Sequence, residues 1–100
     1  MTKIFVYGTL REPEVQMKVI GRMIEGVKDS LLGYKKTTIA INDSTYSIIE
    51  EDLNVNEGVD GLVLDINEDD LINLDEYETD TYKRKEVILR SGTMAWVYCK

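Results

Sequence analysis

The hydrophobic pattern of the chain predicts six short strands separated by turns. Each expected strand is rich in β-branched and aromatic residues and is bounded by glycine or by small polar residues. Asn42-Asp43-Ser44 marks the turn between the second and third strands, and Ser91-Gly92-Thr93 predicts that the last two strands pair as a hairpin. The expected strands cover residues 3–7, 31–41, 45–50, 59–66, 81–90 and 94–99.

The longer period of an amphipathic helix covers residues 14–26. Apolar side chains recur at every fourth position from Val15 to Met23, which places them on one helix face. Gly26 marks the expected end of this helix. Gly21 lies inside the predicted segment and should weaken the helix by about 1 kcal/mol relative to alanine.

A second helix is expected from residue 68 to about residue 77. Asn67 can cap its first turn, and the acidic residues of that turn suit the positive end of the helix dipole. The resulting order of elements predicts an α+β fold. About six strands in so short a chain would dispose of their edges by closing, or nearly closing, into a small mixed barrel flanked by the two helices. The length of 100 residues fits one domain that spans residues 1–100.

The composition excludes several classes of function but does not identify one. The net charge of −7 disfavours nucleic acid and anionic membranes as partners and is interpreted as favouring solubility. The single cysteine, Cys99, cannot form an internal disulfide. Because the chain contains no histidine, Ser-His and Cys-His catalysis and the usual zinc sites are excluded. We find no signal peptide or membrane-length apolar stretch, so a cytoplasmic location is expected. The oligomeric state is left open.

A carboxylate on the apolar face of the second helix is the first candidate for chemistry. Glu78 shares a stripe with Leu71 and Leu74, because residues three and four positions apart lie on one face. Burial and the negative end of the helix dipole would both raise its pKa toward the range that suits a general base. The alternative is that the helix ends by Tyr77, and Glu78 then turns to solvent or pairs with Arg84 or a nearby lysine.

The second candidate is the turn that follows the first strand. Gly8 and Thr9 come directly after the apolar run of residues 4–7. Such a turn exposes backbone N–H groups, and glycine lets a ligand approach the main chain, so the turn could hold a carboxylate. The alternative is an ordinary turn at the end of a core strand.

Four short motifs follow one another in an order that is also found in a known protein family. The sequence carries VYGTL at 6–10, GLVLDI at 61–66, LDEYE at 74–78 and YKR at 82–84. It resembles the gamma-glutamylcyclotransferase-like family and looks most similar to the small gamma-glutamylaminecyclotransferase branch. The resemblance implies a small mixed barrel with a cavity between the first-strand loop and the glutamate-bearing helix.

The same resemblance implies an activity and its residues. In active members the loop backbone, here Tyr7, Gly8, Thr9 and Leu10, holds the substrate's α-carboxylate. The glutamate that closes the Leu-Asp-x-x-Glu motif, here Glu78, is the catalytic acid/base. The implied reaction is the cyclisation of a small gamma-glutamyl amine or peptide to 5-oxoproline with release of the free amine. It requires no metal, cofactor or covalent intermediate.

Other positions leave alternatives open. Tyr82 could line the pocket or donate a hydrogen bond to the developing oxyanion, or it could be a core aromatic on a strand. Arg84 is expected to be a structural partner for Asp75 or another acid. Relatives often carry a proline in the middle strands, where this chain has none and Tyr46 could form the wall. Thr79 replaces the glycine that often follows the glutamate.

Two further classes of function therefore stand beside the enzyme. One is a binding or regulatory module that uses the same cavity for a small carboxylate without chemistry. The other is a structural or protein-interaction domain in which the pocket is incidental.

Overall fold

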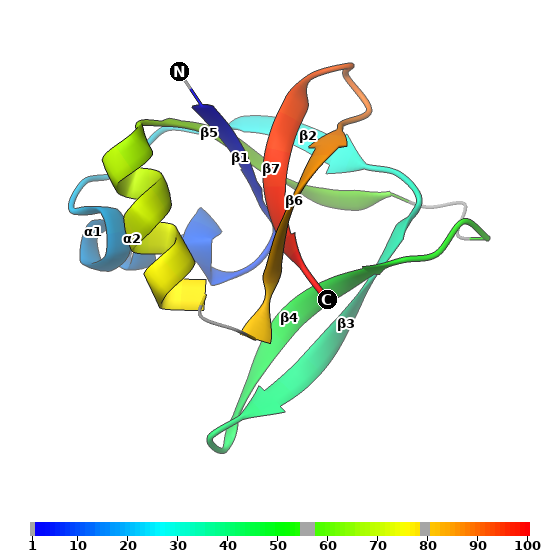
Figure 1. Cartoon of the computed structure of the whole chain (residues 1–100), viewed down its shortest axis with the longest axis horizontal. Coiled ribbons are helices and arrows are strands. Elements are labelled where there is room, and N and C mark those ends of the chain that lie inside the picture. Colours follow the sequence, from blue (N-terminus) through cyan, green and yellow to red (C-terminus); the bar gives the residue numbers. More distant parts are fainter. Residues whose placement is uncertain (1, 55–57, 79–80) are drawn as a thin grey trace.

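The computed structural model describes residues 2–54, 58–78 and 81–100. Within these residues the helices and strands follow the order β-α-β-β-β-β-α-β-β, which confirms the α+β class. The helices are α1 (Pro13–Ile20) and α2 (Glu68–Glu78), and a short 3₁₀ helix covers Thr9–Arg11 (Figure 1). The strands are β1 (Thr2–Val6), β2 (Val27–Leu31), β3 (Tyr34–Ile41), β4 (Ser44–Glu51), β5 (Val59–Ile66), β6 (Lys83–Ile88) and β7 (Met94–Cys99).

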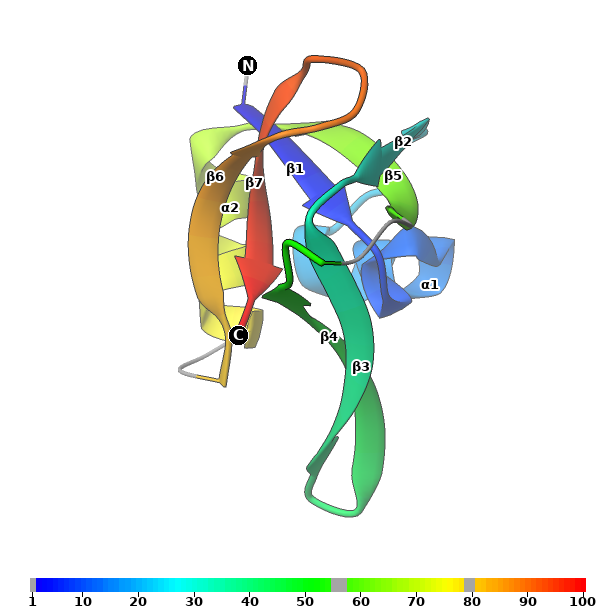
Figure 2. The same ribbon diagram turned by 90° about the vertical axis from the view of Figure 1, so that its right-hand side faces the viewer.

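Five strands form one mixed sheet in the order β2-β5-β1-β7-β6, in which β1 is antiparallel to β5 and parallel to β7. The strands β3 and β4 form a separate hairpin that projects from the body of the molecule in Figure 2. At its base the Lys100 N–H donates to the Ile49 carbonyl at 2.9 Å. The Arg90 N–H donates to the Ser30 carbonyl at 2.8 Å and connects the β6–β7 turn to β2. The strands thus curl as a barrel would, but continuous pairing does not close them.

The first helix is shorter than the predicted segment 14–26. Helix α1 ends at Ile20, and Gly21 follows with φ 85° while its N–H donates to the Met17 carbonyl at 3.0 Å. Glycine adopts this left-handed conformation readily, so Gly21 ends the helix instead of weakening its interior. The prediction that Gly26 ends the helix was wrong. Residues 21–26, which were predicted to be helical, instead connect α1 to β2.

The predicted strand over residues 31–41 begins three residues too early, because β3 starts at Tyr34 and the strand before it was missed. Strand β2 ends at Leu31, and a turn at residues 32–33 precedes β3. Gly33 has φ 81°, which most side chains disfavour and which breaks the extended run. The sequence pattern missed β2 because its charged and polar residues resemble a loop. The structure therefore has one strand more than the six expected, counted over the described residues.

The remaining elements agree closely with the predictions. Strands β5 and β7 have the predicted bounds, β1 and β4 differ by one residue at each end, and β6 is shorter than residues 81–90. The hairpin turn lies at Asn42 and Asp43, whose φ values of 48° and 67° are typical of a two-residue hairpin loop.

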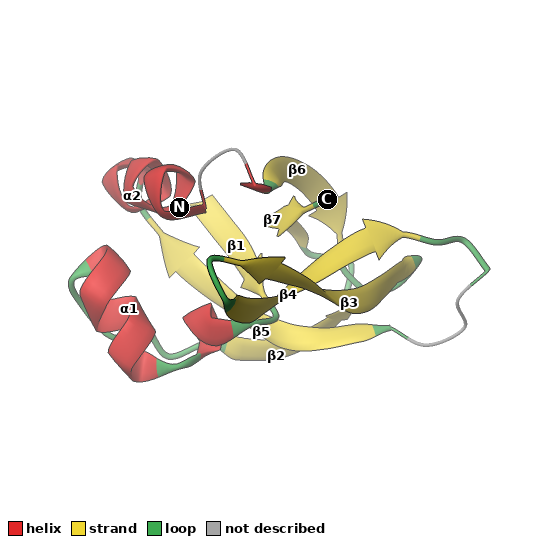
Figure 3. Cartoon of the chain, turned by 90° about the horizontal axis from the view of Figure 1, so that it is seen from below, coloured by secondary structure: helices red, strands yellow, loops and turns green. Residues whose placement is uncertain are grey.

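The central sheet has a buried cluster on each face. Because successive side chains of a strand point to opposite faces, β1 contributes Phe5 to one cluster and Ile4 and Val6 to the other. The cluster of Ile4 and Val6 includes Ile20 of α1 and Leu74 of α2. Figure 3 shows both helices together on this side of the sheet. No helix in the described part of the chain has the length and apolar character to cross a bilayer.

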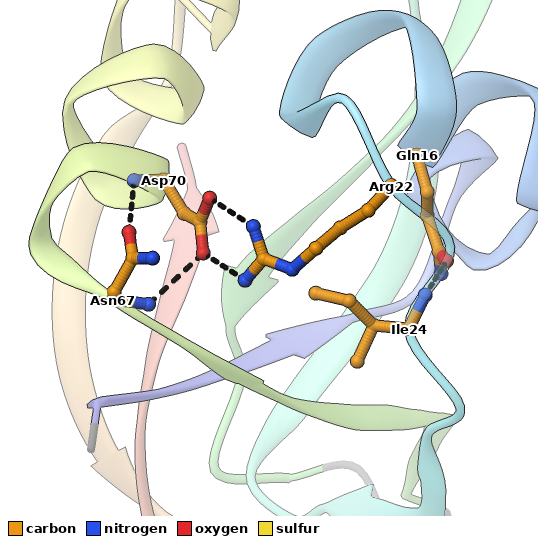
Figure 4. Close-up of polar contacts among 5 residues, drawn as sticks. All are labelled: Gln16, Arg22, Ile24, Asn67 and Asp70. Carbon is orange, nitrogen blue, oxygen red and sulfur yellow. Dashed lines mark hydrogen bonds and ion pairs between the residues drawn. The ribbon is translucent and has the colours of Figure 1, made fainter.

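A polar cluster around the buried Asp70 attaches α2 to the chain after α1 (Figure 4). The Asp70 N–H donates to Asn67 Oδ1 at 2.8 Å, and the Asn67 N–H donates back to Asp70 Oδ2 at 2.9 Å, so the predicted Asn67 cap is confirmed. Both Asp70 oxygens accept hydrogen bonds from the Arg22 guanidinium. The hydrogen bonds from Arg22 hold the pKa of the buried Asp70 below its ordinary value. This cluster sets the start of the helix that ends at Glu78.

Candidate functional site

A pocket of about 320 Å³ lies where the end of β1, the tip of the β3–β4 hairpin, the last turn of α2 and β7 meet. It is lined in part by the six residues that the sequence singled out: Tyr7, Gly8, Thr9, Leu10, Glu78 and Tyr82. Residues that are seventy positions apart in the chain thus share one cavity. Their roles in binding and catalysis stay predictions.

Glu78 is the last residue of α2 and is half-buried at the pocket wall. Burial raises the pKa of its carboxyl from 4.5 to about 7. The suggested ion pair with Arg84 is absent, because the Arg84 Nε lies 3.3 Å from Asp75 Oδ1, as the sequence predicted for that pair. No described residue forms a hydrogen bond or an ion pair with the Glu78 carboxylate. A carboxylate in this state exchanges a proton near neutral pH.

In the loop of residues 7–10 every carbonyl accepts a hydrogen bond, whereas the N–H groups of residues 8–10 are left without one among the described residues. The Gly8 carbonyl accepts hydrogen bonds from the N–H and the Nε–H of Arg11, both at 3.1 Å. The N–H groups of Gly8, Thr9 and Leu10 have no acceptor among the described residues, as is usual at the start of a helical turn. A Cβ at Gly8 would have Ser47 Cβ as its nearest neighbour, at 3.7 Å, so the protein itself leaves space beside this main chain.

Five tyrosines line the pocket, and the hydroxyls of Tyr7, Tyr82 and Tyr98 each donate a hydrogen bond to a described residue. The Tyr7 hydroxyl donates to the Tyr98 carbonyl, and the Tyr82 hydroxyl donates to the Ser47 carbonyl at 2.8 Å. Because the Tyr82 proton is already engaged, the geometry favours Tyr82 as a pocket wall over an oxyanion donor. Burial, with a smaller contribution from the negative charge of Glu78, raises the pKa of all three phenols, so they remain neutral at physiological pH.

Gln16 of α1 supports the loop and was missed by the sequence analysis. Its buried side chain donates from Nε2 to the Leu10 carbonyl at 2.9 Å and accepts the Ile24 N–H at Oε1 at 2.8 Å, the second of which Figure 4 shows. It thereby ties residue 10 of the loop to the chain after α1. A signal was available, because Gln16 lies four positions before Ile20 and so shares the buried face of α1.

The hairpin contributes a wall that the motifs identified only in part. Tyr46 lines the pocket, as suggested, and Ile41 and Asn42 at the hairpin tip do so as well. Thr79, where the sequence departs from the family pattern, lies outside the described residues. Within residues 2–54, 58–78 and 81–100 there is no group of acidic or cysteine side chains that could hold a metal ion.

Known structures share this fold. The solution structure of a protein from Arabidopsis thaliana matches with a TM-score of 0.81 at 26% identity, over 98% of this chain and 67% of that one. Another from the same plant has a TM-score of 0.78 at 23% identity, over 98% and 61%. A structure named gamma-glutamyl cyclotransferase has a TM-score of 0.79 at 18% identity, over 98% and 65%. The chain spans 61% to 67% of the length of these three proteins.

The sequence comparisons identify the family. No curated protein sequence gives a significant match to the chain. The family model described as gamma-glutamyl cyclotransferase, AIG2-like, matches residues 4–100, which include the loop, Glu78 and every strand of the structure except the first two residues of β1. The chain therefore belongs to the AIG2-like gamma-glutamyl cyclotransferase family.

Proposed function

We propose that the chain catalyses the cyclisation of a small gamma-glutamyl compound to 5-oxoproline and releases the attached amine. One observation carries this proposal: the half-buried carboxylate of Glu78 and the N–H groups of residues 8–10, all without a hydrogen-bond partner among the described residues, share one pocket. A base and an anion-binding loop in one pocket are what this reaction needs. A purely structural domain would gain nothing from a buried carboxylate without a partner.

The reaction needs a proton to be moved and the substrate to be held. The α-amine of a gamma-glutamyl group, with an ordinary pKa of about 8, is mostly protonated at neutral pH. Glu78 would take this proton, and the amine nitrogen would attack the γ-carbonyl carbon as the bond to the leaving nitrogen breaks. Glu78 would return this proton to the leaving nitrogen as that bond breaks. Ionised again, it would then take the remaining extra proton from the new ring nitrogen and pass it to the released amine. A pKa of about 7 suits both transfers.

The loop would supply the positioning. The free N–H groups of Gly8, Thr9 and Leu10 can donate to the substrate's α-carboxylate. Fixing that carboxylate would hold the amine close to the γ-carbonyl, which lowers the entropic part of the barrier. In this scheme Tyr82 lines the cavity and the reaction uses no metal or cofactor. The leaving amine is the part of the substrate that this scheme does not specify.

The proposal is tested by measuring 5-oxoproline after incubation with gamma-glutamyl dipeptides, glutathione and gamma-glutamyl-ε-lysine. We expect release from at least one substrate and a loss of at least a hundredfold in Glu78→Gln, since general acid–base catalysis contributes about that much. Glu76→Gln is the matched control, because Glu76 is exposed on the same helix. It should retain wild-type activity.

Three other outcomes would contradict the proposed enzymatic activity. Saturable binding of a gamma-glutamyl compound without any product would indicate the binding or regulatory module. Neither product nor binding would leave a structural or interaction domain. Equal activity in Glu78→Gln and in the wild type would remove Glu78 from the chemistry.

A further inference from the structure

Tyr98 of β7 contacts both walls of the pocket. Its backbone carbonyl accepts the hydrogen bond from the Tyr7 hydroxyl, at the start of the loop. Its own hydroxyl donates to Asp75 Oδ1 at 2.7 Å, on the last turns of α2. One buried residue thus joins the loop of residues 7–10 to the helix that carries Glu78.

Asp75 is where this connection reaches the helix. It lies three residues before Glu78, which is one helical turn. Its Oδ1 also lies 3.3 Å from the Arg84 Nε, and the Arg84 guanidinium lies 4.5 Å from the centre of the Trp96 ring. Of the side chains of residues 71–78, only Asp75 forms a hydrogen bond or an ion pair with the described residues. The polar attachment of the last turn of α2 to β6 and β7 therefore runs through one carboxylate, beside the apolar packing of Leu74.

We propose that Tyr98 is a positioning residue, whose hydroxyl holds Asp75 and thereby fixes the Glu78 carboxylate at its distance from the loop. This role rests on the proposed cyclisation, in which Glu78 and the loop must act on one substrate. Tyr98 takes no part in the proton transfers. Its hydroxyl proton is engaged by Asp75, and burial and that hydrogen bond raise the pKa of its phenol.

The electrostatic surroundings of Glu78 make its position measurable. The groups that face it are the neutral phenols of Tyr7, Tyr82 and Tyr98, while Asp75 and Arg84 offset each other's charge. Burial raises the pKa of Glu78, and no described residue adds a further shift. If the last turn of α2 loosens, its carboxylate gains water and its pKa falls toward the ordinary value.

The variant Tyr98→Phe tests the role, because it keeps the ring and the backbone carbonyl that Tyr7 uses. We expect kcat for 5-oxoproline release to fall about tenfold while KM stays within about twofold, as for a loss confined to the transition state. Tyr34→Phe is the matched control: Tyr34 is also buried and does not line the pocket. It should leave both constants unchanged.

Variants of the partner separate positioning from general stability. Asp75→Asn keeps an oxygen that can accept the Tyr98 hydroxyl, and we expect it to retain at least about a third of kcat. Asp75→Ala should resemble Tyr98→Phe, and the double variant should be no slower than Asp75→Ala alone. Fully additive losses in the double variant, or wild-type kcat in Tyr98→Phe, would overturn the proposal.

A second measurement does not require turnover. Titration of the Glu78 side-chain carboxyl by carbon NMR should show its midpoint about one unit lower in Tyr98→Phe than in the wild type, and unchanged in Tyr34→Phe. An unmoved midpoint would overturn the positioning role, whatever the kinetics. If the wild type makes no 5-oxoproline from any substrate, the proposed function fails, and this titration still decides whether Tyr98 fixes Glu78.

Discussion

At the scale of single residues, Glu78 and Asp75 show how two acids on neighbouring turns acquire different states. Both lie near the apolar stripe of α2, which the spacing of Leu71 and Leu74 predicts. Asp75 forms an ion pair with Arg84 and accepts a hydrogen bond from the Tyr98 hydroxyl. Glu78 has no such partner among the described residues. The sequence predicted the Asp75–Arg84 pair, but Tyr98 reaches Asp75 only because β7 lies beside α2.

Replacing Glu78 by glutamine should change stability in a way that depends on pH. The folded pKa of about 7 exceeds the ordinary 4.5, so between these values the folded state binds a proton that the unfolded chain has released. The free energy of unfolding of the wild type therefore falls as pH rises through this window. At pH 8 we expect Glu78→Gln to be more stable by about 1–3 kcal/mol, with the difference vanishing near pH 4.5.

Urea denaturation of both proteins across pH 4.5–8 measures this difference. If Glu78→Gln were less stable than the wild type at pH 8, the carboxylate would be making a stabilising ion pair in the folded protein. The explanation that burial raises the pKa of Glu78 would then be wrong.

At the scale of elements, local signals predicted where α2 starts but not what holds it in place. Asn67 caps the helix, as its side chain and position suggested. The Asp70–Arg22 pair could not be foreseen, because Arg22 was assigned to a helix that in fact ends at Ile20. Once Gly21 ends α1, the chain turns and carries Arg22 to Asp70. A misplaced helix end thus concealed a contact between two elements.

Asp70→Ala should destabilise the protein by about 2–4 kcal/mol at neutral pH. It removes the two hydrogen bonds from Arg22 and the acceptor for the Asn67 N–H, all at a buried position. Asp69→Ala is the control, because Asp69 is exposed on the same turn and should change stability by less than about 0.5 kcal/mol.

The pH dependence of the Asp70→Ala effect has a definite sign. The folded pKa of Asp70 is lowered below its ordinary 3.8, so its contribution is fully present above that value and is lost as pH falls further. The stability difference between the wild type and Asp70→Ala should therefore shrink below about pH 4. Thermal unfolding of both proteins at pH 7 and pH 3 would check this, and a difference that grew on acidification would contradict the pairing.

At the scale of the whole molecule, the curl of the sheet brings the pocket walls together. Where β5 passes β1, a Cβ on Gly61 would lie 2.3 Å from the Val6 carbonyl oxygen and 2.8 Å from Phe5 Cζ. No real Cβ tolerates such contacts, so glycine at this position permits the close approach. The approach lies beside the point where β1 ends and the loop of residues 7–10 begins.

Gly61→Ala should therefore lower the free energy of unfolding by about 3 kcal/mol, because main-chain atoms of β1 must move. Gly8→Ala is the comparison for stability alone, since its Cβ would meet its nearest neighbour only at 3.7 Å and its φ is negative. It should cost less than about 1 kcal/mol. Equal losses in the two variants, measured by urea denaturation, would show that close packing at Gly61 is not limiting.

The sequence by itself determined the features that depend on neighbouring residues. These are the α+β class, most of the strands, the Asn67 cap, the hairpin turn at Asn42 and Asp43, and the apolar stripe that ends at Glu78. Each follows from side-chain periodicity or from the conformation of one or two residues, so a short stretch of chain contains all the information. The family motifs added the loop and the glutamate as candidates.

Only the tertiary structure decided how these parts face one another. Tyr7 and Tyr98, which are joined by a hydrogen bond, lie 91 positions apart in the chain. The polar strand β2 exists because β5 pairs with it along its length. The burial that raises the pKa of Glu78 likewise depends on walls contributed by β1, β4 and β7. Such contacts arise from strand order and packing over long separations, and no local pattern encodes them.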